Sequence, residues 1–374
     1  MKDPRNVLVI ATRQIGDVLL TAPLIAAARQ RWPDASIDVL GFAGTLGMLK
    51  GNPDIRGFVE VPSGSGWRAA WPFVRRLWRR YDLALITQQS DRAHLYGWVA
   101  ARVRSGLVPG RAAISWWKRC LLTHAVRIDD ETTPTVVEKL KLLEPWRALP
   151  PEVNVAAPPE VALPLDLDAL LGDAPIVVHV PSMWRYKQWP IAKYIEFVGE
   201  LLARGHQVVL TGSKSETDQA QIAEVRALGS PPQVIDVSGQ LNLNQVGTLL
   251  RRAALYVGPD TSITHLAAAC GTPVVALFGP TNPIRWGPWP QGHAASSPYL
   301  RAQPRQSSRR VILLQAEQAC VACGHAGCED HHHSRSLCLE ALPVQRVLDE
   351  CLAELRMRPG KDQREGDLGA SRLK

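Results

Sequence analysis

The chain has 374 residues, of which 46% are hydrophobic and 21% are charged. This length favours two domains over one core, and the composition is that of a globular protein. No apolar run approaches the 18 or so residues of a membrane span, which argues against an integral membrane protein. The net charge of +8 favours an acidic partner, namely a nucleotide, a nucleic acid or an anionic membrane surface. No apolar leader precedes the first strand, and seven cysteines are an odd number for a disulfide scaffold, so we expect no secretion.

Apolar runs alternate with amphipathic stretches through the first half of the chain. The expected strands cover residues 6–12, 36–42, 57–61 and 82–88, and the expected helices cover residues 16–32, 45–51, 67–81 and 94–103. Strands that alternate with helices indicate βαβ units and therefore a parallel sheet.

The proline-rich stretch 144–166 has no helical period and is typical of an interdomain linker. The alternation then restarts, with strands expected at 176–180, 206–212, 233–237, 254–258 and 273–279 and helices such as 191–205 between them. We predict two doubly wound α/β domains, over residues 1–150 and 171–356, joined by a linker at 151–170. The polar, glycine-rich residues 357–374 indicate a disordered tail.

The stretch from Gly258 to Thr281 has the order strand, turn, helix, strand. Asp260 to Ser262 are residue types that cap helix N-termini, and Gly271 is a helix stop. Such a turn points free backbone N–H groups past the carboxyl end of a parallel sheet, where anions and nucleotides bind. The pattern therefore predicts a phosphate site.

The turn after the first strand holds Gly16 and Asp17. From spacing alone Asp17 is better explained as a helix N-cap than as a general base, although both interpretations stay open. Arg13 is either a phosphate contact or a surface cation. The turn lacks the GxGxxG pattern of dinucleotide binding, which argues against NAD or FAD.

Two further loops follow expected strands. Lys187 lies among aromatic residues, and it either neutralises a diphosphate leaving group or is a surface lysine beside the helix start. Glu216 either accepts hydrogen bonds from ribose hydroxyls or is a first-turn glutamate favoured by the helix dipole. All three loops leave the carboxyl ends of strands, which surface residues scattered at random would not do.

The segments "GDVLLTAP", "KQWP", "GSKSE" and "DTSITHLAAACGTPVVALFGPT" occur in this order before a late cysteine cluster. In this respect the chain resembles glycosyltransferase family 9, the ADP-heptose:lipopolysaccharide heptosyltransferases, over roughly residues 6 to 350. The resemblance implies the GT-B fold, in which two Rossmann-like doubly wound parallel-sheet domains face a cleft. It also implies that the N-terminal domain binds the acceptor and the C-terminal domain the nucleotide-sugar donor.

The reaction implied by the resemblance is an inverting, metal-independent transfer of heptose from ADP-heptose to the inner core of lipopolysaccharide, with Asp17 as general base and no cofactor required. The residues that it places at the donor are Lys187, Glu216, Asp260, Thr261, Ser262, His265, Pro280 and Thr281, and those on the acceptor side are Arg13 and Gly16. Ser262 and Ser182 stand where the family usually has glycine, so a different nucleotide-sugar donor stays an alternative.

The implied acceptor is a lipid-linked oligosaccharide, which implies a cytoplasmic protein peripheral to the inner face of the inner membrane. The segment 67–81 spaces Trp71, Val74, Trp78 and Tyr81 as on one helix face, with arginines mostly on other faces. It either lies on an anionic membrane surface or packs its apolar face on the sheet, and we favour the second for the tryptophans. "ISWWKRCLL" is a similar but weaker membrane candidate.

Cys320, Cys323, Cys328 and Cys338 form the pattern C-x2-C-x4-C-x9-C, with His325 and residues 331–333 nearby. This pattern is consistent with a structural zinc site or with reduced, uncoordinated thiols. A nucleic-acid binder is a competing interpretation of the basic chain. Because the basic residues look scattered and no known nucleic-acid motif occurs, we expect no such partner. A catalytically inactive relative that only binds lipopolysaccharide precursors is a third interpretation.

Overall fold

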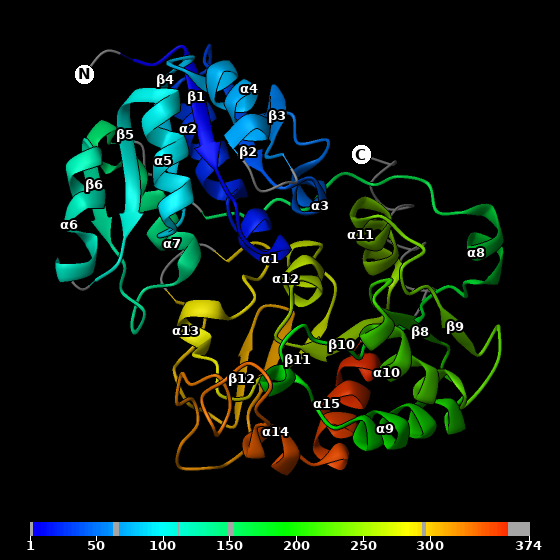
Figure 1. The fold of residues 1–374 in the computed structure, drawn as a ribbon. Coiled ribbons are helices and arrows are strands. Elements are labelled where there is room, and N and C mark those ends of the chain that lie inside the picture. The colour runs from blue at the N-terminus through cyan, green and yellow to red at the C-terminus, as the bar shows by residue number, and fades with distance from the viewer. Residues whose placement is uncertain (1–2, 63–66, 111, 148–152, 294–296, 358–374) are drawn as a thin grey trace, which may run out of the picture.

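The computed structural model describes residues 3–62, 67–110, 112–147, 153–293 and 297–357, which build two β-sheets flanked by helices (Figure 1). The first sheet has the strand order β3-β2-β1-β4-β5-β6, and the second has the order β12-β13-β11-β10-β7-β8-β9. In the described residues all paired strands are parallel except β12, which pairs with β13 in antiparallel fashion at one edge.

The strands of the first sheet are β1 (Asn6–Ile10), β2 (Ser36–Gly41), β3 (Gly57–Glu60), β4 (Tyr81–Ile86), β5 (Ala101–Val108) and β6 (His124–Arg127). The helices that accompany it are α1 (Ile15–Leu19), α2 (Ala22–Arg31), α3 (Ala43–Leu46), η1 (Gly47–Leu49), α4 (Trp67–Leu77), α5 (Asp91–Ala100), α6 (Ala112–Leu121), α7 (Thr135–Leu140) and η2 (Lys141–Trp146).

The strands of the second sheet are β7 (Ile176–His179), β8 (Val208–Thr211), β9 (Val234–Asp236), β10 (Leu255–Pro259), β11 (Val274–Leu277), β12 (Arg305–Ser308) and β13 (Val311–Leu314). Its helices are α8 (Leu165–Leu170), η3 (Arg185–Lys187), α9 (Ile191–Ala203), α10 (Glu216–Arg226), α11 (Leu243–Arg252), α12 (Ser262–Ala269), α13 (Pro283–Trp286), α14 (Leu337–Ala341) and α15 (Val344–Arg356).

The hydrophobic core has an inner part and two outer parts. The inner part joins the side of the first sheet covered by α1, α2 and α7 to the side of the second sheet covered by α11 and α12. The outer parts lie beneath α4 and α5 on the first sheet and beneath α9, α10 and α15 on the second. Helices α4, α5 and α6 therefore lie on the face of the first sheet opposite to that covered by α2 and α7 (Figure 1).

The strands expected from the sequence are present, but four further strands had not been expected. The helix expected over 94–103 ends at Ala100, and β5 starts at the next residue. Strands β6, β12 and β13 were also missed, because each is short and lies at a sheet edge or next to one. The helix expected over 16–32 is split into α1 and α2, with Pro23 in the first turn of α2, where a missing N–H group is tolerated.

The segment expected as a linker lies against α11. The Thr248 hydroxyl donates to the Val161 carbonyl (2.9 Å) and accepts from its N–H (3.0 Å), and Arg251 donates to the Pro158 carbonyl (2.7 Å). Its last six residues form α8, which had not been expected. The expected tail lies outside the described residues apart from Met357, which follows α15.

Trp71 and Trp78 do not pack on the sheet, so the interpretation we favoured for them is wrong. Trp71 is 61% exposed and Trp78 is 54% exposed, whereas Phe73 and Leu77 are the buried residues of α4. Tyr81 is not in the helix at all, because the chain has already entered β4, where its hydroxyl donates to Asp38. The side chains of residues 63–70 lie outside what the structure describes.

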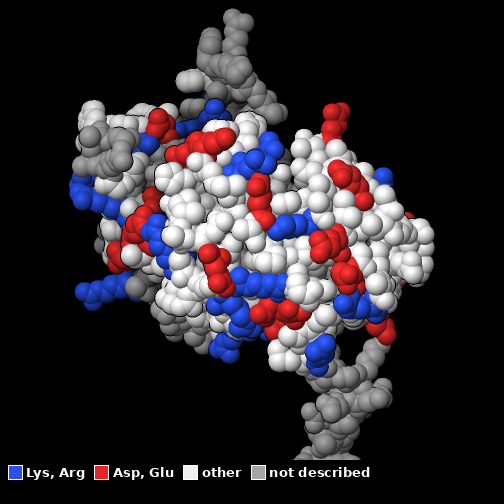
Figure 2. All heavy atoms as spheres, turned by 90° about the horizontal axis from the view of Figure 1, so that it is seen from below, with Lys and Arg blue, Asp and Glu red and all other residues white. Residues whose placement is uncertain are grey.

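No helix in the described parts of the chain is long and apolar enough to cross a membrane. The face seen from below in Figure 2 carries Lys and Arg side chains interspersed with Asp and Glu.

Candidate functional site

Both sheets have a topological switch point, at which the strand order reverses. It lies between β1 and β4 in the first sheet and between β7 and β10 in the second. Ligands of open α/β sheets bind beyond the carboxyl ends of the strands at such points. The turn with Gly16 and Asp17 follows β1, the loop with Lys187 follows β7, and the turn with Asp260 follows β10. The fold therefore places these three sequence motifs at the two switch points.

Lys187 and Asp260 form an ion pair across the switch point of the second sheet. The Lys187 Nζ lies 2.7 Å from an Asp260 carboxylate oxygen, and the two side chains are 19% and 5% exposed. Burial lowers the pKa of Lys187, but Asp260 and then Tyr186 outweigh this effect, so the pKa is raised overall. Lys187 is thus a fixed cation at this sheet edge, and its interpretation as a free surface lysine is wrong.

The N-terminus of α12 faces the first sheet. Thr261 is the N-cap residue of α12, and its side chain makes no capping hydrogen bond. Helix α1 packs against α12 (Figure 1), and a Cβ atom built on Gly16 would lie 3.5 Å from the Cα of Ser262 and 3.5 Å from the His265 ring. The two sheets therefore meet where the predicted base turn and the predicted phosphate turn lie.

Two buried polar atoms near this meeting point lack a partner among the described residues. They are His265 Nδ1 on α12 and Thr281 Oγ1 in the turn after β11. Burial lowers the pKa of His265; the charges of Asp260 and Asp17 oppose this shift, and that of Lys187 adds to it. Because buried polar groups are normally hydrogen-bonded, these two atoms are available to bind a ligand or a water molecule.

The Asp17 carboxylate is mostly buried beside cations from two directions. Its side chain is 12% exposed, and Arg13 Nε lies 3.9 Å from Oδ2. Lys139 on α7 donates to the Asp17 carbonyl oxygen at 2.6 Å. Asp17 lies inside α1 and does not cap it, since Gln14 occupies the N-cap position, so the N-cap interpretation is wrong.

Glu216 and Ser182 are placed less centrally. Glu216 is the first residue of α10, is exposed, and follows β8, two strands from β10. The two interpretations of Glu216 both stay predictions. The Ser182 hydroxyl accepts from the Trp184 N–H at 3.4 Å, so it is used within its own loop. Pro280 accepts from the Gly324 N–H at 2.8 Å, which ties the turn after β11 to the cysteine-containing loop.

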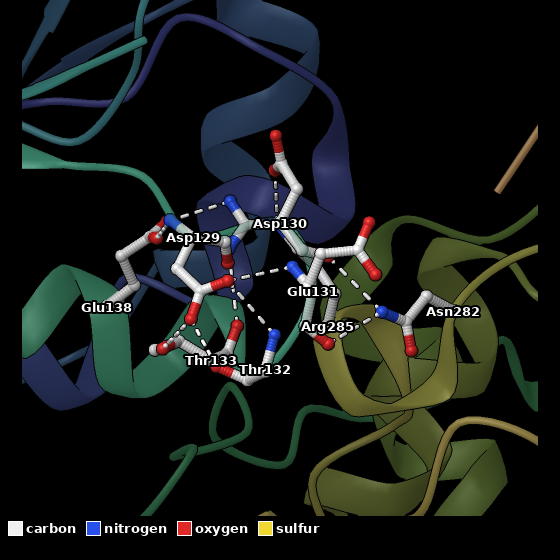
Figure 3. A network of polar contacts seen from close by, with 8 residues as sticks. All are labelled: Asp129, Asp130, Glu131, Thr132, Thr133, Glu138, Asn282 and Arg285. Carbon is white, nitrogen blue, oxygen red and sulfur yellow. Dashed lines mark hydrogen bonds and ion pairs between the residues drawn. The ribbon is translucent and has the colours of Figure 1, made fainter. Parts of the chain in front are cut away.

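The polar network in Figure 3 joins the two sheets beside this site. Arg285 on α13 donates to Glu138 on α7 (2.8 Å), and both side chains are almost fully buried. It also contacts the Asp130 carboxylate (2.9 Å) and the Asp129 and Thr133 carbonyls. Asn282 adds hydrogen bonds to the carbonyls of residues 130 and 131. We call this network the Arg285 clasp.

The cysteine-containing loop packs on the Lys187 loop. The His332 ring stacks on Trp184 at 4.0 Å, and Ser336 donates to the Tyr186 carbonyl at 2.6 Å. The pKa of Cys338 is raised to about 11, chiefly by burial and further by the other three cysteines. No cluster of three or more His, Cys, Asp or Glu in the described residues is arranged so that it could hold a metal ion. The zinc site stays a prediction, and elemental analysis of the purified protein tests it.

Sequence reasoning missed Lys139, Glu138 and Arg285. Glu138 and Lys139 lie in the short segment "TVVEKL", whose charges look like those of any exposed helix. Only the tertiary fold buries them. Arg285 lies four residues after Thr281 in the sequence. This closeness to the predicted phosphate turn is the signal that could have drawn attention to it.

Comparison with known proteins gives a consistent result. The family model for glycosyltransferase family 9 (heptosyltransferase) matches residues 70–312. Lipopolysaccharide heptosyltransferase 3 of Escherichia coli is 30% identical over 286 residues, which cover 73% of this chain and 83% of that protein.

Two solved structures share the fold. E. coli ADP-heptose lps heptosyltransferase II superposes with a TM-score of 0.71 at 22% identity and covers 94% of this chain and 98% of its own. E. coli heptosyltransferase WaaC with ADP has a TM-score of 0.68 at 18% identity, with coverages of 93% and 99%. This likeness shows the two-domain α/β GT-B fold expected from the sequence.

Proposed function

Because the chain belongs to glycosyltransferase family 9 (heptosyltransferase), which confirms the resemblance drawn from its motifs, it is a glycosyltransferase, and we propose that it transfers heptose from ADP-heptose to the inner core of lipopolysaccharide. The observation that carries this proposal is the meeting of Asp17 from the first sheet with α12 and the Lys187–Asp260 pair from the second. A transferase needs a base and a leaving-group site that face each other in this way.

The proposed chemistry is an inverting displacement. The acceptor hydroxyl oxygen attacks the anomeric carbon, its proton passes to the Asp17 carboxylate, and the bond from that carbon to the diphosphate oxygen breaks. The negative charge that develops on the leaving ADP is stabilised by Lys187, by the N–H groups that begin α12, and by the turn at Pro280 and Thr281. His265 Nδ1 and Thr281 Oγ1 would gain partners from the bound donor. The step asks for no cofactor.

The test is an assay of transfer with ADP-heptose together with titrations of ADP, UDP and GDP. We expect binding of ADP and not of UDP or GDP, and we expect Asp17→Asn to abolish transfer while ADP binding is retained. Preference for UDP or GDP would leave the transferase assignment in place but overturn the proposed ADP-heptose donor. This outcome is tested because Ser262 and Ser182 stand where the family usually has glycine. Unchanged turnover in Asp17→Asn would overturn its role as the base.

The proposed acceptor is lipid-linked, so the enzyme would work at the inner face of the inner membrane, and the outer side of the first sheet suits such a surface. Trp98 and Trp116, on α5 and α6, are exposed as Trp71 and Trp78 are. Trp78 and Trp98 touch edge to face, and the Arg79 guanidinium lies over both rings. We call this surface the Trp–Arg face. Indoles beside guanidinium groups are typical of a membrane–water interface.

The net charge of the chain originates from this part of it. Residues 61–128 contain twelve Lys and Arg but only two Asp and Glu. The net positive charge of this segment is therefore larger than the +8 of the whole chain. We had expected the basic residues to be scattered along the chain, but they are concentrated in this segment. In contrast, charges of both signs mix on the face seen in Figure 2. The exposed tryptophans on the same surface favour an anionic bilayer over a nucleic acid, whose backbone recruits basic side chains without an apolar layer.

Sedimentation with vesicles tests this surface. We expect binding to vesicles with phosphatidylglycerol, weaker binding to phosphatidylcholine alone, and loss of binding in W71S/W78S. The matched control is Leu165→Ser, which removes an exposed apolar side chain from α8 on the second sheet. Binding to a DNA duplex but not to vesicles, or vesicle binding that survives W71S/W78S, would overturn the assignment.

A further inference from the structure

Lys139 is a buried cation that contacts the helix of the proposed base. Its side chain is 1% exposed, and its ammonium group donates to the Asp17 carbonyl oxygen at 2.6 Å and to the Thr21 hydroxyl at 3.3 Å. Both acceptors are neutral. A fully buried lysine normally has a hydrogen-bonded carboxylate, so the position of Lys139 needs an explanation.

The charges around Lys139 single out Asp17. Burial lowers the pKa of Lys139 to about 8; the charges of Asp17 and Glu138 oppose this shift, and those of Arg13 and Arg285 add to it. The Glu138 carboxylate is already engaged by Arg285 at 2.8 Å and by the Asp129 N–H at 2.7 Å. The Asp17 carboxylate is therefore the anion that remains to balance Lys139.

The fold does not need this ammonium group to pair the Asp17 carbonyl. That carbonyl also accepts from the Thr21 hydroxyl at 2.9 Å, so α1 keeps a partner without Lys139. Removing a charge from water costs stability, and the two groups that accept hydrogen bonds from Lys139 are both neutral, so they repay little of this cost. Burying the Lys139 ammonium group therefore costs folding free energy, and this cost suggests that the charge has a role in the reaction.

Helix α7 holds Lys139 rigidly. The neighbouring residue Glu138 is locked into the Arg285 clasp, and α7 packs against α2. Two successive residues of one helix thus reach in different directions, one toward α1 and one toward the second sheet. Helix α7 therefore contacts the Asp17 turn through Lys139 and α13 through Glu138, whose contact with Arg285 is drawn in Figure 3.

We propose that Lys139 is a positioning residue for glycosyl transfer, which orients α1 through its hydrogen bonds to the Asp17 carbonyl and the Thr21 hydroxyl and places a buried positive charge beside the proposed base. This inference rests on the proposed role of Asp17 as the base. Other cations near Asp17 are Arg13, which is half exposed and screened by water, and Lys187, which belongs to the second sheet. Lys139 is the buried cation that the first sheet itself supplies.

The experiment compares K139M, K139R and the control K118M. Lys118 is a matched control because it is also buried in the first half of the chain and donates to a backbone carbonyl, that of Gln89, at 2.6 Å, but it pairs with Asp91 instead of Asp17. We measure kcat, KM for ADP-heptose, the pH dependence of kcat and the melting temperature of each variant.

For K139M we expect kcat to fall by about tenfold or more with little change in KM, because a displaced base affects the chemical step. We expect the acid limb of the kcat–pH profile to move to higher pH, since a buried positive charge beside the proposed base is lost. The melting temperature should change little, because Lys139 hydrogen-bonds only neutral groups, unlike Arg285 with Glu138. K139R should recover most of the rate and the original profile, and K118M should leave both unchanged.

A wild-type rate and profile in K139M would overturn the inference, as would a loss of rate that follows a lowered melting temperature without a shift in the profile. If K139M fails to fold, K139Q removes the same charge, and the same readouts decide. Asp17→Asn separates the two proposals: activity in that variant defeats the proposed base, whereas an inactive Asp17→Asn with a normal K139M defeats only the positioning role.

Discussion

Lys187 and Asp260 follow different strands of the second sheet, yet their charged atoms lie 2.7 Å apart in a largely buried setting. A pair of this kind is held in place before any ligand arrives. A diphosphate that binds there meets a cation whose position is already fixed, which reduces the entropy lost on binding.

We predict that Lys187→Met weakens ADP binding by about tenfold or more, because it removes the cation and leaves the Asp260 carboxylate to repel the diphosphate. Isothermal titration with ADP measures this change. Lys187→Arg should keep part of the affinity. The control is Arg185→Met, which removes a cation two residues away whose side chain is exposed. Equal ADP affinity in Lys187→Met and the wild type would show that this cation does not touch the diphosphate.

At the residue scale, the sequence predicts which residues lie at the site better than it predicts which residues contact one another there. Asp17, Lys187 and Asp260 could be located because each follows an apolar strand, and the carboxyl ends of parallel strands are where ligands bind. Lys139 could not be located in this way, because its contact with α1 arises only when the fold brings α7 next to α1, and the two residues are more than a hundred positions apart in the sequence. A contact of that kind leaves no local pattern.

At the element scale, β7 ends on a histidine that makes the stability of the second sheet depend on pH. The His179 Nδ1 lies 2.9 Å from the Thr211 hydroxyl at the end of β8. Burial lowers the pKa of His179 to about 4, and the charge of Asp218 opposes this shift. The unfolded chain takes up this proton below about pH 6.5 and the folded chain only near pH 4, so stability falls as the pH drops through this window.

We predict that this histidine alone removes roughly 2 kcal/mol of stability between pH 7.5 and pH 5. His179→Gln keeps a group that can hydrogen-bond Thr211 but cannot titrate, so its unfolding free energy should fall less over the same range. Urea denaturation at the two pH values measures the difference. His333→Gln, an exposed histidine, should behave as the wild type. A slope in His179→Gln equal to that of the wild type would contradict the prediction.

The elements themselves were predictable where their hydrophobic pattern was strong. The strands β1, β7, β10 and β11 are continuous apolar runs and were located within a few residues. Helix α4 shows the opposite case. Trp71 and Trp78 have the spacing of one helix face, but Phe73 and Leu77 are the residues buried against the sheet. Hydrophobicity alone cannot tell which of two apolar stripes the sheet covers.

At the scale of the whole molecule, the site depends on how the two sheets are held together, since Asp17 belongs to one and Lys187 to the other. The inner hydrophobic core supplies attraction without a fixed direction. The Arg285 clasp supplies direction, because the guanidinium group donates to Glu138 and to two carbonyls of the first half of the chain in one geometry.

We predict that Arg285→Met destabilises the protein by about 3–5 kcal/mol, since the Glu138 carboxylate is left buried without its cation. Thermal and urea denaturation measure this loss. The control is Arg301→Met, which removes an exposed ion pair with Glu131 across the same junction and should cost about 1 kcal/mol or less. A loss in Arg285→Met no larger than that in Arg301→Met would mean that the buried pair contributes little to holding the sheets together.

The double variant E138L/R285L separates stability from geometry. Because it removes both charges, the stability lost in Arg285→Met should largely return. Transfer activity should stay low, since leucines fill the space without fixing how α7 and α13 are oriented, and Asp17 would no longer be held against the donor turn. Full activity in the stable double variant would mean that the hydrophobic core alone sets the geometry. Low activity at normal stability would assign the clasp to alignment of the reacting groups.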